Sequence, residues 1–300
     1  MCRSFQTTIC SLLLLASGVW VDGATASPAR FHYMGADVLP PFEINGQSVK
    51  IHCQGLVVSD DHYLITGRCE AKPKRAFLLR LDRRDASARF EYVDLAPREV
   101  NGKRLDHPGG FDRDEQGMYW IPLSTSRPAG PSLICGYNLD SRRPLSDLKA
   151  ETCFEVDDHI GAVCRAGAGD GRLLGANWDT KQVYLWSKDG QLIKRMGFRQ
   201  MFAKSPVSRF AIQDWKFARL SDRAWIIAGG IDKSRQRGKA NLQLIDLAQG
   251  VIHTNHYFAD RSDVSRPVTN EGLAWYQDTL YLLPEDIGRG AKVLRYRLEW

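Results

Sequence analysis

The amino-acid sequence predicts an all-β protein, a five-bladed β-propeller in which an N-terminal strand completes the last blade. Three observations support this fold class: a short segment recurs five times, β-rich runs follow each copy, and one strand-like run near the N-terminus has no partner of its own. The five copies are residues 52–56 (HCQGL), 107–111 (HPGGF), 159–163 (HIGAV), 211–215 (AIQDW) and 269–273 (TNEGL).

The spacing of the copies fits the size of a propeller blade. They begin 52 to 58 residues apart, and each is followed by a polar turn and a β-rich run such as residues 63–66 (YLIT). Two further strand-like runs usually come before the next copy, which gives four strands per repeat of about 50 residues. The last copy has only three strands, so residues 30–33 (RFHY) are expected to form the outermost strand of the fifth blade. A β-sandwich or an irregular all-β domain is the alternative.

The first residues read as an export signal. Arg3 precedes an apolar run at residues 11–21, and residues 24–26 (ATA) resemble a signal-peptidase site. The run is shorter than the roughly 20 residues that a membrane-spanning helix needs. We therefore expect residues 1–26 to be a signal peptide, residues 27–300 to be one propeller domain, and the product to be secreted or periplasmic. We also expect a monomer without a membrane span.

The cysteines predict two disulfides. If two facing strand residues flank a hairpin turn, their numbers are centred on that turn. Cys53 and Cys69 are centred on residue 61, and Cys135 and Cys153 on residue 144, both of which lie in turn-like sequence. Cys53–Cys69 and Cys135–Cys153 are the predicted disulfides, which suit an oxidising compartment. Cys164 is left over and is expected to be a small buried residue.

Three histidines occupy the same position in successive copies. His52, His107 and His159 should meet around the axis, where Glu271 (or Gln54) could complete the first shell of a divalent metal. The alternative is that these histidines only hydrogen-bond neighbouring blades, because no short metal-ligand spacing accompanies them. Without a metal, a histidine such as His159 paired with Asp214 or Glu271 could act as a general acid or base. The candidate catalytic residues are therefore His159, Asp214 and Glu271.

The loops on the predicted binding face carry more basic than acidic residues, whereas the opposite turns are acidic. A positive field at one mouth attracts anionic ligands; the alternative is that these loops only keep the protein soluble. Trp178 is the tryptophan expected to stack on a ligand. Nucleic acid is not expected, because no binding motif is present. The candidate ligand-binding residues are Gln54, Arg68, Arg127, Asn177, Trp178, Gln213, Asn270 and Glu285.

The ordered set of motifs resembles a bacterial family of exported propeller-like proteins that carries only a domain-of-unknown-function label. The motifs are residues 107–110 (HPGG), 159–162 (HIGA), 177–179 (NWD), 213–217 (QDWKF), 270–273 (NEGL) and 282–286 (LLPED). The resemblance implies a propeller and export, and supplies no activity. More distantly, the chain is similar to gluconolactonase and strictosidine-synthase-like propellers, in which carboxylate and amide side chains bind an axial metal. The three histidines depart from that pattern.

Three hypotheses follow for the function. The first is a binding protein for a small or polymeric anionic ligand, with a carbohydrate as one candidate. The second is a metal-assisted hydrolase or lyase that uses the axial histidines. The third is a protein-interaction scaffold, which rests on the fold alone.

Overall fold

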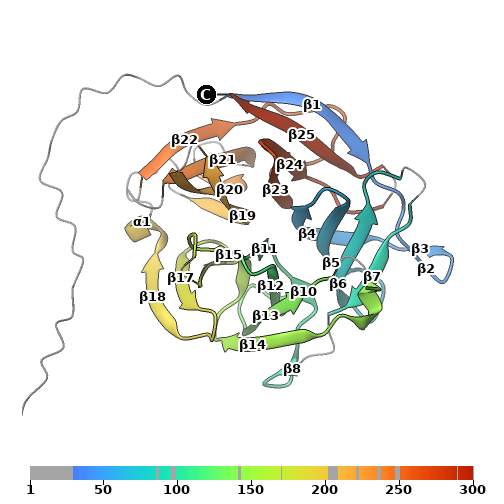
Figure 1. The fold of residues 1–300 in the computed structure, drawn as a ribbon, viewed down its shortest axis with the longest axis horizontal. Coiled ribbons are helices and arrows are strands. Elements are labelled where there is room, and N and C mark those ends of the chain that lie inside the picture. The colour runs from blue at the N-terminus through green and yellow to red at the C-terminus, as the bar shows by residue number, and fades with distance from the viewer. Residues whose placement is uncertain are drawn as a thin grey trace, which may run out of the picture.

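The chain forms a ring of five antiparallel β-sheets around a central axis, as Figure 1 shows in a view along that axis. The computed structural model describes residues 30–299 except 86–87, 96–98, 141–142, 170, 202–208, 221–222, 235–237, 247–250 and 289. The predicted signal peptide, residues 1–26, lies outside the described residues. The predicted five-bladed β-propeller is confirmed.

Each blade runs from an inner strand at the axis to an outer strand at the rim. Blade 1 contains β4 (Ile51–Val58), β5 (His62–Cys69), β6 (Arg75–Asp82) and β7 (Glu91–Asp94). Blade 2 contains β10 (His107–Pro108) and β11 (Asp112–Arg113), which share the inner position, then β12 (Met118–Ser124), β13 (Ser132–Asn138) and β14 (Ala150–Val156). Blade 3 contains β15 (Ile160–Arg165), β16 (Arg172–Asn177), β17 (Gln182–Ser187) and β18 (Leu192–Gly197).

The last two blades complete the ring. Blade 4 contains β19 (Phe210–Leu220), β20 (Arg223–Asp232), β21 (Lys239–Asp246) and β22 (Val251–Tyr257). Blade 5 contains β23 (Gly272–Tyr276), β24 (Thr279–Leu283), β25 (Lys292–Glu299) and the N-terminal strand β1 (Arg30–Val38). Short elements lie outside the blades: the hairpins β2 (Glu43–Ile44) with β3 (Gln47–Ser48) and β8 (Glu99–Val100) with β9 (Lys103–Arg104), the 3-10 helix η1 (Leu145–Asp147), and the helical turn α1 (Phe198–Met201).

The N-terminal strand closes the ring, as the sequence predicted. β1 pairs antiparallel with β25, from Arg30 opposite Glu299 to Val38 opposite Lys292. The two strands lie side by side at the outer edge of blade 5 (Figure 1). This pairing ties both ends of the described chain into one sheet and covers the edge that β25 would otherwise expose.

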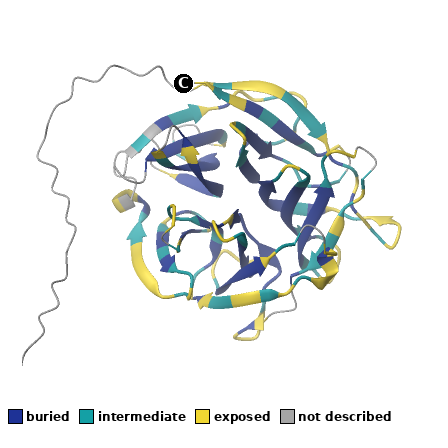
Figure 2. Ribbon diagram, in the orientation of Figure 1, coloured by how far each residue is buried: buried dark blue, intermediate teal, exposed yellow. Residues whose placement is uncertain are grey.

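The apolar side chains form five clusters, one between each pair of neighbouring blades. Successive strand residues point to opposite faces of a sheet, so each strand contributes to two clusters. On β16, for example, Leu173 packs toward blade 2 and Leu174 toward blade 4. The buried colour therefore fills the interior of the ring, and exposed residues lie mainly on the rim and in loops (Figure 2). Both faces of a strand such as β12 are covered, which explains its nearly continuous apolar run.

The fourth residue of each repeated segment lies where the inner strands converge. Four of these five residues are small: Gly55, Gly110, Ala162 and Gly272, whereas the fifth is Asp214. A Cβ atom at Gly110 would lie 2.5 Å from the Asp214 Oδ1 atom, so the small residues leave the space that this carboxylate occupies. The Oδ2 atom of Asp214 accepts hydrogen bonds from the backbone N–H groups of Leu56 and Leu273, each at 3.1 Å.

The second carboxylate oxygen of Asp214, Oδ1, connects the inner strands to blade 2 through Lys216. Its Oδ1 atom accepts a hydrogen bond from the Trp215 N–H group at 2.9 Å and from the Lys216 ammonium at 2.5 Å. Lys216 also donates to the carbonyl oxygen of Phe111 at 2.5 Å. One buried ion pair therefore joins the inner strands of blades 1, 2, 4 and 5 at the axis.

Three inner strands carry a β-bulge at the third residue of the repeated segment. The register shifts at Gln54 in blade 1, at Gly161 in blade 3 and at Gln213 in blade 4. A bulge adds one residue to a strand and re-aims side chains next to binding sites. Here it places Gln54 and Gln213 at the same end of the axis.

The disulfide predictions had different outcomes. Cys135 faces Cys153 on β13 and β14, and the two are joined by a disulfide, as predicted. The structure contradicts the Cys53–Cys69 disulfide, because both thiols are free. The register of the hairpin is the reason. Near the turn, Val58 faces Tyr63, which would bring Cys53 opposite Arg68, and the bulge at Gln54 moves it one residue further, so that Cys53 faces Gly67 and Cys69 faces Ile51. Cys164 is buried, as predicted, and burial raises the pKa of its thiol.

This pairing predicts the number of free thiols. The chain without residues 1–26 contains five cysteines, so one disulfide leaves three thiols, on Cys53, Cys69 and Cys164. We expect a thiol titration of the unfolded, unreduced protein to count three. A count of one would show that Cys53 and Cys69 are joined after all.

Candidate functional site

A cavity of about 240 Å³ opens at the end of the axis where the inner strands begin. We call it the axial cavity. Its side chains come from four blades, because the repeat brings equivalent positions together around the axis. Its lining includes Gln54, Trp178, Ile212, Gln213, Lys233 and Asn270.

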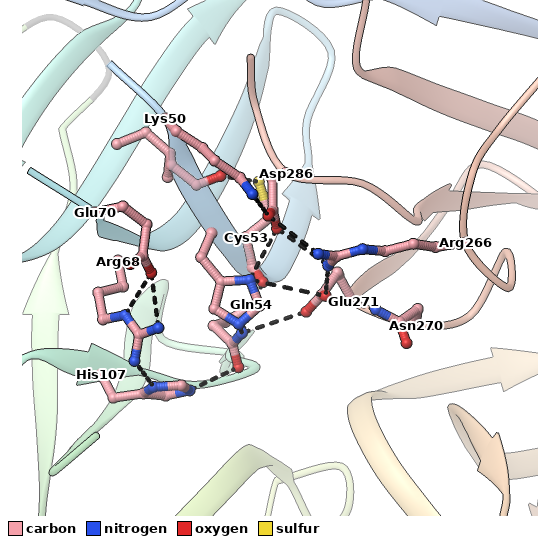
Figure 3. Close-up of polar contacts among 12 residues, drawn as sticks. Lys50, Cys53, Gln54, Arg68, Glu70, His107, Arg266, Asn270, Glu271 and Asp286 are labelled. Atoms are coloured by element: carbon pink, nitrogen blue, oxygen red, sulfur yellow. Dashed lines mark hydrogen bonds and ion pairs between the residues drawn. The ribbon is translucent and has the colours of Figure 1, made fainter. Parts of the chain in front are cut away.

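Gln54 connects two of the three axial histidines. Its Nε2 atom donates to His52 Nε2 at 2.9 Å, and its Oε1 atom accepts from His107 Nε2 at 3.1 Å. The same Nε2 atom lies 3.3 Å from Glu271 Oε2 (Figure 3). The amide therefore stands between His52 and His107 and fixes the orientation of both rings.

Asp286 is the centre of a second group of contacts, shown in Figure 3. Its carboxylate accepts a hydrogen bond from His52 Nδ1 at 2.8 Å and pairs with Lys50 at 2.9 Å. Arg266 bridges the two carboxylates, with nitrogens 3.2 Å from Asp286 and 2.7 Å from Glu271. The carboxylates of Asp286 and Glu271 are thus paired with cationic side chains of the same protein.

The two carboxyl groups have pKa values that are shifted in opposite directions. Burial raises the pKa of Glu271 well above its ordinary value, against the opposing effect of Arg266. Burial also acts to raise the pKa of Asp286, but the hydrogen bonds from His52 and Lys50 outweigh it and hold this pKa well below its ordinary value. Glu271 is therefore the weaker acid of the two and Asp286 the stronger.

His107 and His159 are buried and favour the neutral state. Burial lowers the pKa of His107 well below its ordinary value, and nearby His159 and Arg68 lower it further. Burial also lowers the pKa of His159. His159 donates from Nδ1 to the carbonyl oxygen of Arg127 at 2.6 Å, while its buried Nε2 atom has no hydrogen-bond partner among the described residues. The ring centroid of His159 lies 4.9 Å from that of Trp178.

The predicted metal site can be tested against these contacts. The three rings do lie in a row, with centroids 5.9 Å apart for His52 and His107 and 5.6 Å apart for His107 and His159. However, both ring nitrogens of His107 already have partners, Arg68 at Nδ1 and Gln54 at Nε2. The arrangement of His52, His107, His159 and Glu271 is therefore not that of one metal shell.

A smaller group of possible ligands lies beside it. Ligand atoms of His52, Glu271 and Asp286 lie within 4.8 Å of one another. His52 is hydrogen-bonded directly to Asp286, and Lys50 and Arg266 supply positive charge to the carboxylates. In this arrangement the positive charges of Lys50 and Arg266 balance the two carboxylates, and a metal site at this cluster stays a prediction.

The structure places four of the eight predicted ligand-binding residues on the axial cavity: Gln54, Trp178, Gln213 and Asn270. The other four make structural contacts. Arg68 pairs with Glu70 and donates a hydrogen bond to His107, and the backbone carbonyl of Arg127 accepts one from His159. The side chain of Asn177 donates to Asp158 and accepts from the Gln182 N–H group. The carboxylate of Glu285 accepts from Ser265.

None of the three predicted catalytic residues, His159, Asp214 and Glu271, lines the axial cavity. Asp214 is fully buried and its oxygens have four hydrogen-bond donors, so it holds the inner strands together and presents no face to a ligand. Lys50 and Arg266, which form ion pairs with the carboxylates of Asp286 and Glu271, were not identified from the sequence. Both come just before a copy of the repeated segment, and that position was the available signal.

Comparisons with known proteins agree on the fold alone. No family model matches the chain, and no curated protein matches it. Solved structures do. One belongs to the GH130 family of mannoside phosphorylases, whose glycoside hydrolases target β-1,2 mannosidic linkages in Candida mannan; it is 12% identical, with a TM-score of 0.56 over 92% of this chain and 95% of that one.

Two further solved structures are similar. The Malassezia sympodialis allergen Mala s 1 has a TM-score of 0.51 at 9% identity, over 86% of this chain and 82% of that one. A glycosyl hydrolase from Bacteroides ovatus has a TM-score of 0.50 at 13% identity, over 83% and 84%. The similarity to gluconolactonase-type propellers stays a prediction. Among the described residues, no helix has the length and apolar character to cross a membrane.

Proposed function

We propose that this protein is an exported β-propeller whose axial cavity binds an anionic carbohydrate. The observation that carries the proposal is the composition of the axial cavity: one exposed indole, three amide side chains and one ammonium group surround about 240 Å³. Ligand pockets usually measure about 300–1,000 Å³, so this cavity suits one sugar ring rather than a larger ligand.

Trp178 supplies the apolar wall. Its side chain is 38% exposed, although most large apolar residues of the ring are buried. Edge contacts with His107 and His159, at centroid distances of 5.5 and 4.9 Å, hold the indole in place. A held, exposed indole offers a flat surface on which the C–H face of a sugar ring can pack at little entropic cost.

Gln54, Gln213 and Asn270 supply hydrogen-bonding groups around this wall. Amides both donate and accept, which matches the hydroxyl groups of a sugar. Gln54 is already oriented by His52 and His107, so it does not have to be ordered by the ligand. Its two N–H groups are used by His52 and by the carbonyl oxygen of Cys53, so it offers the ligand only its Oε1 atom as an acceptor.

Lys233 supplies the positive charge. It is exposed, and within the described ranges no carboxylate lies within ion-pair distance of it. An acidic group on the ligand would complete this pair. The carbohydrate class also agrees with the similar solved structures, two of which are described as acting on glycosides.

The proposed function is binding of the carbohydrate and does not include a catalysed reaction. Glu271 is 3% exposed and makes its contacts with Gln54, Asn270 and Arg266, so it lies behind the residues that line the cavity. The metal-assisted hydrolase is not favoured, because the contacts of the histidines do not form a metal shell. Export rests on the predicted signal peptide and agrees with the Cys135–Cys153 disulfide.

Calorimetric titration with D-galacturonate and D-galactose tests the proposal. The wild type is expected to bind the acid more tightly than the neutral sugar, because only the acid can pair with Lys233. Trp178→Ala should weaken binding about tenfold or more, which corresponds to about 1.4 kcal/mol. Lys233→Met should remove the preference for the acid.

The matched control is Lys194→Met, which removes the same charge from an exposed position on β18, at the rim of blade 3. It is expected to bind as the wild type does. Equal affinity of Trp178→Ala and the wild type, or no binding of either sugar, would count against the proposal.

A further inference from the structure

We infer that the ligand is a chain of acidic sugars, and that it extends from the axial cavity along a basic groove between blades 3 and 4. The inference rests on the proposed function and adds the polymeric nature and the path of the ligand. The basic groove is a second cavity of about 450 Å³, with Lys181, Phe198, Arg199, Arg209, Phe210 and Lys233 in its lining.

The basic groove adjoins the axial cavity. Lys233 lines both of them. On β19, Phe210 and Ala211 line the groove, whereas the next two residues, Ile212 and Gln213, line the axial cavity. On the facing blade, Trp178 of the axial cavity is followed directly by Asp179 and Thr180 of the groove. A ligand that leaves the axial cavity past Lys233 therefore enters the groove.

Three of the four basic side chains of the groove are not neutralised by the described part of the protein. Arg199, Arg209 and Lys233 are exposed, and none of them has a carboxylate within ion-pair distance among the residues that the structure describes. Lys181 pairs with Asp179 at 2.6 Å. By contrast, Lys50, Arg68 and Arg266 on the opposite side of the axial cavity are all paired with carboxylates. The positive charge that remains for a ligand thus lies along the groove.

The apolar groups of the groove point to sugar units rather than to isolated anions. Phe198 and Phe210 belong to its lining, and both are mostly buried, so they form an apolar floor between the cationic groups. A chain of uronate units alternates apolar C–H faces with carboxylates and matches this combination. A single uronate ring would fill the axial cavity and leave the groove unused.

The chain length of the ligand tests this inference. Affinities for mono-, di- and tetragalacturonate are measured by calorimetry with the wild type and with the double variant Arg199→Glu/Arg209→Glu. We expect the wild type to bind the tetramer about tenfold or more tightly than the monomer, since each exposed ion pair contributes a factor of up to about five. The double variant should lose this gain and keep the wild-type affinity for the monomer.

The control is Lys194→Glu, which reverses a charge on the rim of blade 3 and should keep the gain with chain length. Monomer and tetramer binding with equal affinity to the wild type would overturn the inference and leave the proposed function standing. A gain that persists in Arg199→Glu/Arg209→Glu would also overturn it. No binding of any of the three ligands would contradict the proposed function itself.

Discussion

Replacing Asp214 with alanine is expected to lower the free energy of unfolding by about 3–5 kcal/mol, the cost of breaking a buried ion pair. The Asp214 carboxylate is fully buried and accepts from the backbone N–H groups of Leu56 and Leu273 on two other blades. The variant would leave these donors without an acceptor and the Lys216 ammonium without its counter-ion. Urea unfolding followed by tryptophan fluorescence measures the effect.

A double variant separates the charge from the hydrogen bonds. Asp214→Ala with Lys216→Met removes the unpaired ammonium as well, so it should be more stable than Asp214→Ala alone, yet less stable than the wild type because the N–H groups stay unsatisfied. A loss of less than about 1 kcal/mol in Asp214→Ala would show that this ion pair does not hold the axis together.

The second large effect concerns Gly110, which lies next to the same carboxylate. A Cβ atom there would lie 2.5 Å from Asp214 Oδ1 and 2.9 Å from the carbonyl oxygen of Gln213. Both neighbours are fixed, and the backbone of Gly110 is itself hydrogen-bonded to blade 3 through Gly161 and Val163. Gly110→Ala should therefore cost about 3 kcal/mol, the upper end of the range for overpacking.

Gly288→Ala is the matched control, since nothing lies within 4 Å of its Cβ position. It should unfold at nearly the same urea concentration as the wild type. If the two glycine variants had equal stability, the close approach of the inner strands at Gly110 would be wrong.

The features that could be predicted from the sequence are those that the five-fold repeat determines. The five copies predicted the number of blades and the starts of the inner strands, and the unpartnered run at residues 30–33 predicted the closing strand. The Cys135–Cys153 disulfide could be predicted because the two residue numbers are centred on the turn and the residues face each other on β13 and β14, even though the register shifts between Gly136 and Tyr137. Periodicity and turn residues carry this information, and neither depends on distant contacts.

The errors occurred where a local irregularity determines the strand register, or where a contact with a distant residue determines the role of a side chain. The register of the β4–β5 hairpin together with a one-residue bulge at Gln54 separates Cys53 from Cys69, and no sequence pattern indicated either of them. The roles of the polar residues at the axis depend on their hydrogen bonds. Gln54 is hydrogen-bonded to the nitrogens of His52 and His107 that a metal would need. Asp214 accepts hydrogen bonds from backbone N–H groups of two other blades. Side-chain partners that are far apart in the sequence could not be derived from the repeat alone.

A crystal structure of the protein soaked with D-galacturonate tests the central claim most directly. It should show one sugar ring in the axial cavity, packed on Trp178, with its carboxylate near Lys233 and its hydroxyl groups near Gln213 and Asn270. A ring bound elsewhere on the propeller, or an axial cavity that holds only water at saturating galacturonate, would contradict the account.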